Sequence, residues 1–259
     1  MKNTESASIQ VIDRMAKLLE AIAAAEPASL KILSAETGLH PSTAHRILAS
    51  LVDNGLVERN PAGHYCLGNR LLGWAGRVQA RVDVRREALP VMEALRTALG
   101  ETVNLTVRDG DEVVYVERVS SPQAVRVEQV IGGRAPLHVT AVGKLFLGFD
   151  GQAAALDYAR RTGLPAFTKH TLTDPGLLWE AARRAWECAY ALDDEEADLG
   201  VGCIGVPVRD ANGRMVAGLS VSAPIERRRD EWVAQVMAAG ERLSARLGYR
   251  GGQPGRTRA

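Results

Sequence analysis

Three side chains in the C-terminal half are of the types that nucleophilic catalysis requires. Cys203 is a thiol, His138 is a base, and Asp193 is an acid that could orient the base. Cys203, however, falls in the middle of a predicted strand, without a helix N-terminus or basic neighbour to lower its pKa. No GxSxG, HExxH, P-loop or GxGxxG motif is present. A thiol-dependent hydrolase or transferase using Cys203 is therefore the alternative hypothesis, and we expect that the protein is not an enzyme.

A binding chemistry follows from the two alternating runs that flank Asn212-Gly213, a pair that favours a two-residue hairpin turn. In that register Cys203 opposes Ser222 and Gly205 opposes Ser220, and opposed side chains share one face. The residues of one face are small and weakly polar: Cys203, Gly205, Pro207, Gly218, Ser220 and Ser222. The other face is predicted core: Ile204, Val206, Val208, Leu219 and Val221. The small face leaves room for a ligand or for a covering helix, and the pattern leaves both open.

The segment TAVGK, residues 140–144, opens a predicted helix with Thr140 as a candidate N-cap. Exposed N–H groups and the positive end of the helix dipole favour an anion such as a carboxylate. On this pattern alone, an ordinary helix start beside the sheet is the favoured interpretation.

A second polar constellation lies in HPSTAHRILASLVDNG, residues 40–55, a predicted helix with Pro41 in its first position. Its buried stripe is Ala44, Ile47, Leu48 and Leu51, whereas Arg46 lies on the opposite side. Arginine pairs with guanine, and serine or threonine contacts phosphates or bases. The predicted DNA-binding residues are Ser42, Thr43, His45, Arg46 and Ser50, with Arg59 and His64 from a following hairpin. The alternative is a solvated helix face, and charge does not decide, because residues 1–75 carry seven basic and seven acidic side chains.

The elements that position these residues form two patterns. Helix 9–25, a second helix between Ser29 and Gly38, the helix after Pro41, and strands 56–59 and 64–67 give the order of a winged helix-turn-helix. From residue 101 the pattern is α+β: strands 102–107, 113–119 and 125–130, helices 140–149, 152–162 and 174–190, the hairpin about Asn212-Gly213, and helix 231–247. We expect a DNA-binding domain at 1–75, a helical linker at 76–100, a second domain at 101–250 and a disordered tail at 251–259.

Composition is that of a globular protein: 259 residues, 46% hydrophobic, with a formal net charge of +1. The three cysteines are widely spaced, which predicts neither a disulfide framework nor a metal site. The N-terminus lacks the apolar core of a signal peptide, and no run approaches the ~20 apolar residues that span a bilayer. We expect a soluble, cytoplasmic protein without a membrane partner or cofactor.

The chain resembles the isocitrate-lyase-regulator (IclR) family of bacterial transcription factors. The matching segments are SAETGLHPSTAHRILASLVDNGLVER, PLHVTAVGK and YALDDEEADLGVGCIGVPVRDANGRMVAGLSVSAP, in the family's order. The resemblance implies a winged helix-turn-helix, a linker helix and a GAF/PAS-like effector-binding domain. It implies a repressor or activator that binds palindromic double-stranded operator DNA as a homodimer or homotetramer, a dimer of dimers. Ser34 departs from the alanine common in relatives, a small change that leaves helix packing possible.

The same resemblance implies where the effector binds. The family's pocket is lined at the positions of Asp193, Cys203, Ser220 and Ser222, and the TAVGK turn, with Ala141, Val142 and Gly143, closes it from the other side. The effector is expected to be a small organic acid, either a short oxo-acid or an aromatic carboxylate.

Overall fold

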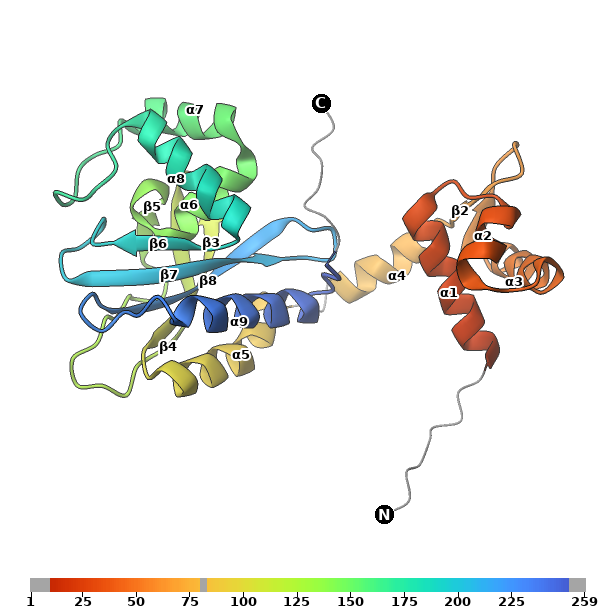
Figure 1. Cartoon of the computed structure of the whole chain (residues 1–259), viewed down its shortest axis with the longest axis horizontal. Coiled ribbons are helices and arrows are strands. Elements are labelled where there is room, and N and C mark those ends of the chain that lie inside the picture. The colour runs from red at the N-terminus through yellow and green to blue at the C-terminus, as the bar shows by residue number, and fades with distance from the viewer. Residues whose placement is uncertain (1–9, 80–82, 252–259) are drawn as a thin grey trace, which may run out of the picture. The chain divides into compact units, whose positions relative to one another are not determined.

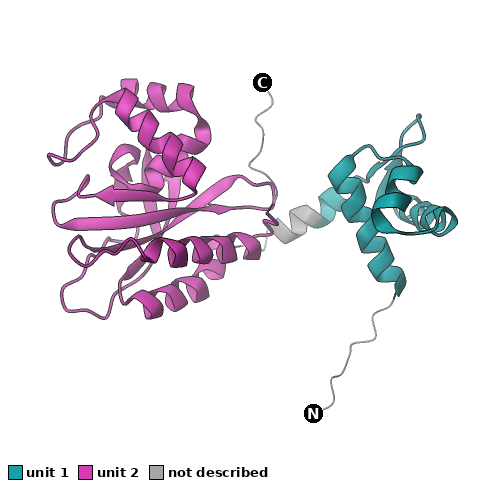
Figure 2. Ribbon diagram, in the orientation of Figure 1, with its two compact units in different colours: residues 1–81 teal, residues 82–259 magenta. Residues whose placement is uncertain are grey.

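The computed structural model describes residues 10–79 and 83–251, and the chain forms two compact units, 1–81 and 82–259 (Figure 2). Each unit has a hydrophobic core of its own. Of the predicted tail, residues 252–259 lie outside the described residues.

The first unit begins with three helices: α1 (Gln10–Ala25), α2 (Leu30–Thr37) and α3 (Pro41–Asp53). Ser29 caps α2 by accepting a hydrogen bond from the N–H of Ile32 at 3.4 Å. Gly38 ends this helix in the left-handed conformation, with φ +66°, which glycine adopts without a Cβ penalty. The predicted helix–glycine turn–helix arrangement is thereby confirmed.

A hairpin and a further helix complete this unit. Strands β1 (Val57–Arg59) and β2 (Tyr65–Leu67) pair antiparallel, and α4 (Arg70–Gln79) follows. The core beneath the helices and the hairpin includes Leu18, Leu33, Leu48, Val57 and Tyr65. Three helices followed by this wing confirm the predicted winged helix-turn-helix.

The second unit is built on a six-stranded antiparallel sheet with the order β5-β4-β3-β8-β7-β6. Its strands are β3 (Thr102–Asp109), β4 (Glu112–Val119), β5 (Arg134–Pro136), β6 (Ala191–Asp194), β7 (Val201–Arg209) and β8 (Met215–Pro224). Helices cover both faces (Figure 1). The α+β class is therefore confirmed.

The two helical layers follow the alternation of the strands. On one face α5 (Val84–Leu99) and α9 (Trp232–Arg246) pack against the aliphatic side chains, among them Leu105, Ile204 and Leu219. On the other face lie the short helix η1 (Leu137–Val139) and helices α6 (Ala141–Asp150), α7 (Gln152–Thr162) and α8 (Pro175–Cys188). The aliphatic face predicted as core is thus the α5/α9 face.

The segment expected as one linker, residues 76–100, is divided at residues 81 and 82 between the two units. Its second half, α5, buries Ala88, Val91, Met92 and Leu95 against the sheet. This amphipathic packing makes α5 a layer of the second unit rather than a spacer.

The strand expected at 125–130 is not formed. The edge of β4 pairs instead with β5, and Gly132 and Gly133 extend this pairing through hydrogen bonds with Tyr115. Segment 125–130 is held by side chains, including a hydrogen bond from Arg227 to the carbonyl of Val125 at 2.8 Å, and Val125 and Val130 are 70% and 73% exposed. Its alternation of apolar and charged residues was therefore misleading, because no strand edge is available to it.

The register of β7 and β8 is as predicted, but the turn is not. Residues 211–213 form a three-residue loop between Asp210 and Arg214. The N–H of Asp210 donates to the carbonyl of Arg214, and the carbonyl of Asp210 accepts the N–H of Gly213. A register shift between Val208 and Arg209 then restores the expected pairs, Cys203 with Ser222 and Gly205 with Ser220. The loop is one residue longer than predicted, and the bulge shifts the pairing back by one residue, so the register beyond it is the predicted one.

Candidate functional site

The first candidate site is the start of α3. His40 is the N-cap: its Nδ1 accepts the N–H of Ser42 at 3.4 Å and contacts the Ser42 hydroxyl at 2.8 Å. Pro41 occupies the first helical position, where its missing N–H leaves no partner unsatisfied. Ala44, Leu48 and Leu51 are buried, as the stripe predicted. This end of the helix is therefore fixed while its outer side stays exposed.

The predicted DNA-binding residues of α3 lie on that outer side. Ser42, His45, Arg46 and Ser50 are exposed, and Thr43 is half-buried. Among the described residues, Arg46 has no hydrogen bond or ion pair, so its guanidinium can pair with a base or a phosphate without losing a partner. The structure thus leaves Arg46 available to a ligand.

The two wing residues are held differently. Arg59 is exposed, its Nε donates to the carbonyl of Gly63 at 3.0 Å, and its guanidinium carbon lies 5.6 Å from the centre of the Tyr65 ring. His64 is half-buried, and its N–H donates to the Asn60 side chain at 3.0 Å. Arg59 therefore stiffens the wing, whereas the His64 contact fixes its backbone.

The second candidate site lies in the second unit, on the small-residue face of the sheet. Strand pairing places Asp193, Cys203, Ser222 and Thr102 in one row across four strands. Gly205, Ser220 and Asn104 form the next row, and Gly218, Thr106 and Tyr115 the third. The Cys203 sulfur lies 3.2 Å from the Ser222 hydroxyl, to which Asn104 Nδ2 donates at 3.1 Å. Polar side chains from distant segments thus meet on one face.

A cavity of about 160 Å³ opens above these rows. Six of the seven predicted effector residues line it: Ala141, Val142, Asp193, Cys203, Ser220 and Ser222. The lining also includes Thr106, Val113, Tyr115, Gln129, Arg134, Ala135, Thr140, Ala197, Asp198 and Val201. The structure therefore brings together residues that the sequence places about eighty positions apart.

Gly143 is the predicted effector residue that does not line the cavity. Its N–H donates to the Thr140 hydroxyl at 3.0 Å, which caps α6. An added Cβ at Gly143 would meet the Leu137 carbonyl oxygen at 2.1 Å, so only glycine fits there. Gly143 therefore permits the close helix start, while Ala141 and Val142, with N–H groups in the first turn, face the cavity.

The small face also receives α6 directly. A Cβ at Gly218 would lie 2.1 Å from Val142 Cγ1, and one at Gly205 would lie 3.1 Å from the Val142 nitrogen. Both alternatives left open by the sequence therefore apply. The glycines admit the helix, and Cys203, Ser220 and Ser222 line the adjoining cavity.

The Asp193 side of the cavity is acidic and buried. Burial raises the pKa of Asp193 to about 6, although its oxygen accepts the N–H of Glu196 at 2.9 Å and Lys144 is nearby. Burial also raises the pKa of the Cys203 thiol far above its usual range, and the charge of Asp193 acts in the same direction. Cys203 is therefore a neutral thiol that can donate or accept weakly.

The catalytic alternative is not supported by this geometry. The ring of His138 is buried and engaged elsewhere, with Nδ1 2.8 Å from the Tyr158 hydroxyl and Nε2 3.1 Å from the Pro165 carbonyl. Desolvation lowers the pKa of His138, and the Cys203 thiol stays protonated. The thiol and the imidazole thus lack the contact that would activate a nucleophile.

The sequence prediction missed the contribution of β3 and β4 to the cavity. Thr102, Asn104 and Thr106 alternate with Val103, Leu105 and Val107, so their common face could have been read from the period of two. Tyr115 could have been read from the Asp109-Gly110 hairpin, because pairing runs unbroken from Asp109–Glu112 to Thr106–Tyr115. The bulge that leaves Val116 unpaired lies beyond this pair.

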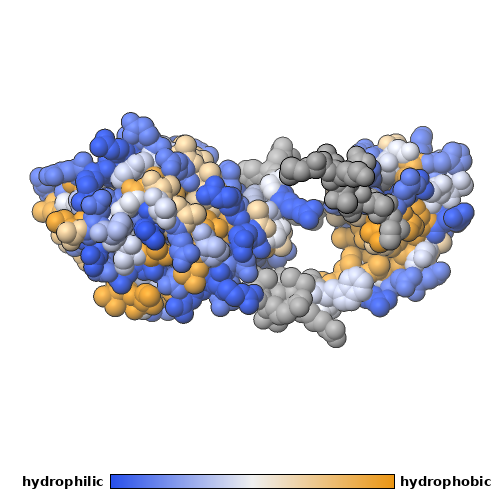
Figure 3. Space-filling view, turned by 90° about the horizontal axis from the view of Figure 1, so that it is seen from below, coloured by the Kyte–Doolittle hydropathy of each residue, from blue (hydrophilic) through white to orange (hydrophobic). Residues whose placement is uncertain are grey.

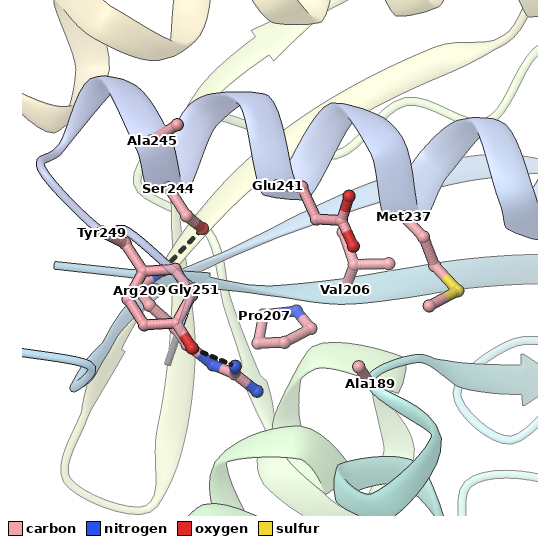
Figure 4. A pocket seen from close by; sticks show the side chains of 10 residues that line it. All are labelled: Ala189, Val206, Pro207, Arg209, Met237, Glu241, Ser244, Ala245, Tyr249 and Gly251. Carbon is pink, nitrogen blue, oxygen red and sulfur yellow. Dashed lines mark hydrogen bonds between the residues drawn. The ribbon is translucent and has the colours of Figure 1, made fainter. Parts of the chain in front are cut away.

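A larger cavity of about 390 Å³ lies between α9 and the end of β7 (Figure 4). Arg209 lies at one end of it: its N–H donates to the Ser244 hydroxyl at 3.0 Å and its Nη1 to the Tyr249 hydroxyl at 3.1 Å. The remaining walls are mostly apolar, including Val206, Pro207 and Met237. Because this cavity contains none of the predicted effector residues, we place the candidate ligand site at the smaller one.

Within residues 10–79 and 83–251, no cluster of three or more His, Cys, Asp or Glu side chains could hold a metal ion. No helix there has the length and apolarity that crossing a membrane requires.

Comparison with known proteins matches both units to one family. Residues 11–61 match the IclR helix-turn-helix domain, and residues 76–245 match the bacterial transcriptional regulator IclR C-terminal domain. The HTH-type transcriptional regulator XynR of Escherichia coli is 34% identical over 248 residues, covering 93% of this chain and 98% of XynR. The transcriptional repressor IclR of the same organism is 31% identical, covering 88% of this chain and 84% of IclR.

Solved structures agree. The Agobacterium tumefaciens repressor BlcR superposes with a TM-score of 0.75 at 27% identity, covering 95% of this chain and all of BlcR. An IclR homolog complexed with 4-hydroxybenzoate, from Microbacterium hydrocarbonoxydans, gives a TM-score of 0.60 at 27% identity, covering 92% and 98%. A winged helix-turn-helix, a polar cavity at a helix start and a match along nearly the whole chain lead to one conclusion: the chain belongs to the IclR family of bacterial transcriptional regulators, with a C-terminal ligand-binding domain.

Proposed function

We propose that the protein represses or activates transcription by binding a palindromic operator. Binding of a small organic acid changes its affinity for that operator. The observation that carries this proposal is the cavity on the small-residue face, where the start of α6 meets Asp193, Cys203, Ser220 and Ser222. N–H groups at a helix start favour a carboxylate, and the hydroxyls bind further oxygens. A relative of the same fold was solved with 4-hydroxybenzoate, which is an acid of this kind.

DNA recognition is assigned to α3 and the wing. Ser42, Thr43, His45, Arg46 and Ser50 would face the major groove, with Arg59 and His64 beside it. Because residues 1–75 carry no net charge, specificity must come from local contacts rather than from a general attraction to phosphates. Arg46 is the principal residue of this assignment.

A palindromic operator requires at least two copies of the chain. The first unit supports this with exposed apolar residues on α1 and α4: Val11, Ile12, Leu72 and Trp74. Apolar surface on this unit is visible in Figure 3. Exposed apolar side chains that gather on one unit are typical of an interface, and we assign them to a homodimer or a dimer of dimers.

The test of the DNA assignment is selection of duplexes from a random library by the full-length protein. We expect an enriched inverted repeat, and we expect Arg46→Ala to weaken binding to it by about 1–3 kcal/mol, with relaxed preference at one base pair of each half-site. Lys31→Ala, on the exposed side of α2, is the matched control for loss of one positive charge. If Arg46→Ala and the wild type bind the selected sequence equally, the recognition assignment is wrong.

The test of the effector assignment is a thermal-shift screen of carboxylic acids against the same protein. An acid at a hundredfold excess over its Kd should stabilise the protein by about 2.7 kcal/mol. Ser222→Ala should reduce the shift for every acid that binds, since it removes a hydroxyl from the cavity floor.

A further inference from the structure

The size of the cavity limits the effector more tightly than the family match does. The cavity holds about 160 Å³. A protein cavity of about 150 Å³ accommodates one benzene molecule, which has six non-hydrogen atoms. An aromatic carboxylate with a ring hydroxyl is considerably larger than that. The volume therefore favours a short acid.

Tyr115 is the bulkiest side chain that borders the cavity, and it is the only aromatic one among the described residues that line it. Unbroken pairing from Asp109–Glu112 to Thr106–Tyr115 puts it on the same face as Thr106, the cavity side of the sheet. The bulge that leaves Val116 unpaired comes only after this pair. The one ring at the cavity is thus positioned by the β3–β4 hairpin.

The hydroxyl of Tyr115 is able to donate a hydrogen bond to a ligand. No hydrogen bond joins it to another described residue. Burial raises the pKa of Tyr115 well above its usual range, and the negative charges of Asp193 and Asp198 act in the same direction. The phenol therefore stays protonated and can donate one hydrogen bond.

We propose that Tyr115 sets the size limit of the effector: its ring occupies the space that a larger acid would need, and its hydroxyl donates to the second oxygen of a short oxo- or hydroxy-acid. The carboxylate of this acid would lie at the N–H groups of Ala141 and Val142. The inference rests on the proposed effector function and adds the effector's class, an acid of about six or seven non-hydrogen atoms.

The experiment is calorimetric titration of the full-length protein with straight-chain 2-oxo and 2-hydroxy acids of increasing length and with 4-hydroxybenzoate. For the wild type, we expect the tightest binding at about three or four carbons and at least a tenfold loss for longer acids and for 4-hydroxybenzoate. Tyr115→Ala, which opens roughly one benzene ring of space, should bind the longer acids and 4-hydroxybenzoate at least tenfold more tightly than the wild type does.

Two variants separate size from hydrogen bonding. Tyr115→Phe keeps the ring and should keep the length limit while weakening the best short acid about fivefold. Tyr115→Leu enlarges the cavity less than Tyr115→Ala does and keeps an apolar side chain there. It replaces the alanine variant if far-UV circular dichroism shows that the alanine variant does not fold. Tyr190→Phe, outside this cavity, is the control and should match the wild type.

The two proposals fail in different ways. If neither the wild type nor any variant binds an acid of the series, the effector assignment itself is overturned. If the wild type binds short acids but Tyr115→Ala and Tyr115→Leu leave the length limit unchanged, the effector assignment stands and the role of Tyr115 is overturned. Binding of 4-hydroxybenzoate to the wild type as tightly as the best short acid would also overturn it.

Discussion

At the scale of single residues, the most unusual group is the carboxylate of Asp193. It is buried beside the Cys203 thiol and the carboxylate of Glu196, and its side chain accepts the backbone N–H of Glu196. Lys144 lies nearby, but it forms a buried ion pair with Glu196. A charge held in this way costs stability, and proteins tolerate such a cost mainly where a ligand uses the group.

Replacing Asp193 with asparagine should stabilise the protein at pH 8. The pKa of Asp193 is raised from about 3.9 in the unfolded chain to about 6, so protonation favours the folded state. The stabilising contribution of the protonated form is complete below pH 4 and is lost as the pH rises through 6. Asp193→Asn keeps the acceptor oxygen and should gain about 1–3 kcal/mol at pH 8 and almost nothing at pH 4.

The measurement is urea unfolding followed by tryptophan fluorescence, since three of the four tryptophans lie in the second unit. Asp198→Asn is the matched control: Asp198 lines the same cavity but is exposed, and its replacement should change the free energy of unfolding by only a few tenths of a kcal/mol. Equal gains for Asp193→Asn at both pH values would show that the buried charge is not the cause.

At the scale of elements, the site depends on how closely α6 approaches the sheet. Gly205 and Gly218 place no side chain at their own positions on this face of β7 and β8, and Val142 fills the space above Gly218. Because Ala141 and Val142 at the start of α6 line the cavity, the distance of α6 from the sheet fixes the geometry of the site. Glycine is required here for close approach rather than for a positive φ.

Adding one methyl group at this contact should be costly. Gly218→Ala would place a Cβ 2.1 Å from Val142 Cγ1 and 2.6 Å from Cγ2, so the core must shift. We expect a loss of about 1–3 kcal/mol in the free energy of unfolding. The double variant with Val142→Ala removes both methyl groups, leaves a 2.9 Å contact and should recover at least half of the loss.

A double-mutant cycle in urea provides the measurement, with Val142→Ala alone as the reference. Independent additive losses for the two substitutions would mean that Gly218 is not limited by Val142.

The sequence predicted most elements, and the exceptions have structural causes. The N-caps Ser29 and Thr140, the proline in the first position of α3, and the alternation in β7 and β8 are local signals, so they could be read directly. The false strand at 125–130 and the facing of the residues after Val116 depend on which edge of β4 is occupied and where it bulges. These are consequences of long-range pairing, which residue patterns do not encode.

At the scale of the whole molecule, the two candidate sites belong to different units, and regulation requires that they be coupled. The formal charge is +1 for the whole chain and zero for residues 1–75, so residues 76–259 carry +1 by difference. Neither part attracts DNA or an anionic effector over long distances. Any response of DNA binding to the effector must therefore come from a change of conformation between states that the effector binds unequally.

Coupling of this kind is reciprocal. If the best-binding short acid changes operator affinity about 5- to 150-fold, the operator must change the affinity for that acid by the same factor and in the same direction. The measurement is the Kd of the acid with and without a saturating operator duplex, compared with the Kd of the operator with and without the acid. Arg46→Ala supplies the control at a duplex concentration that saturates the wild type but leaves most of the variant unbound, because unbound protein should bind the acid equally in both cases. Equal acid affinity for the free and the DNA-bound wild type would mean that the cavity does not regulate DNA binding, even if an acid fills it.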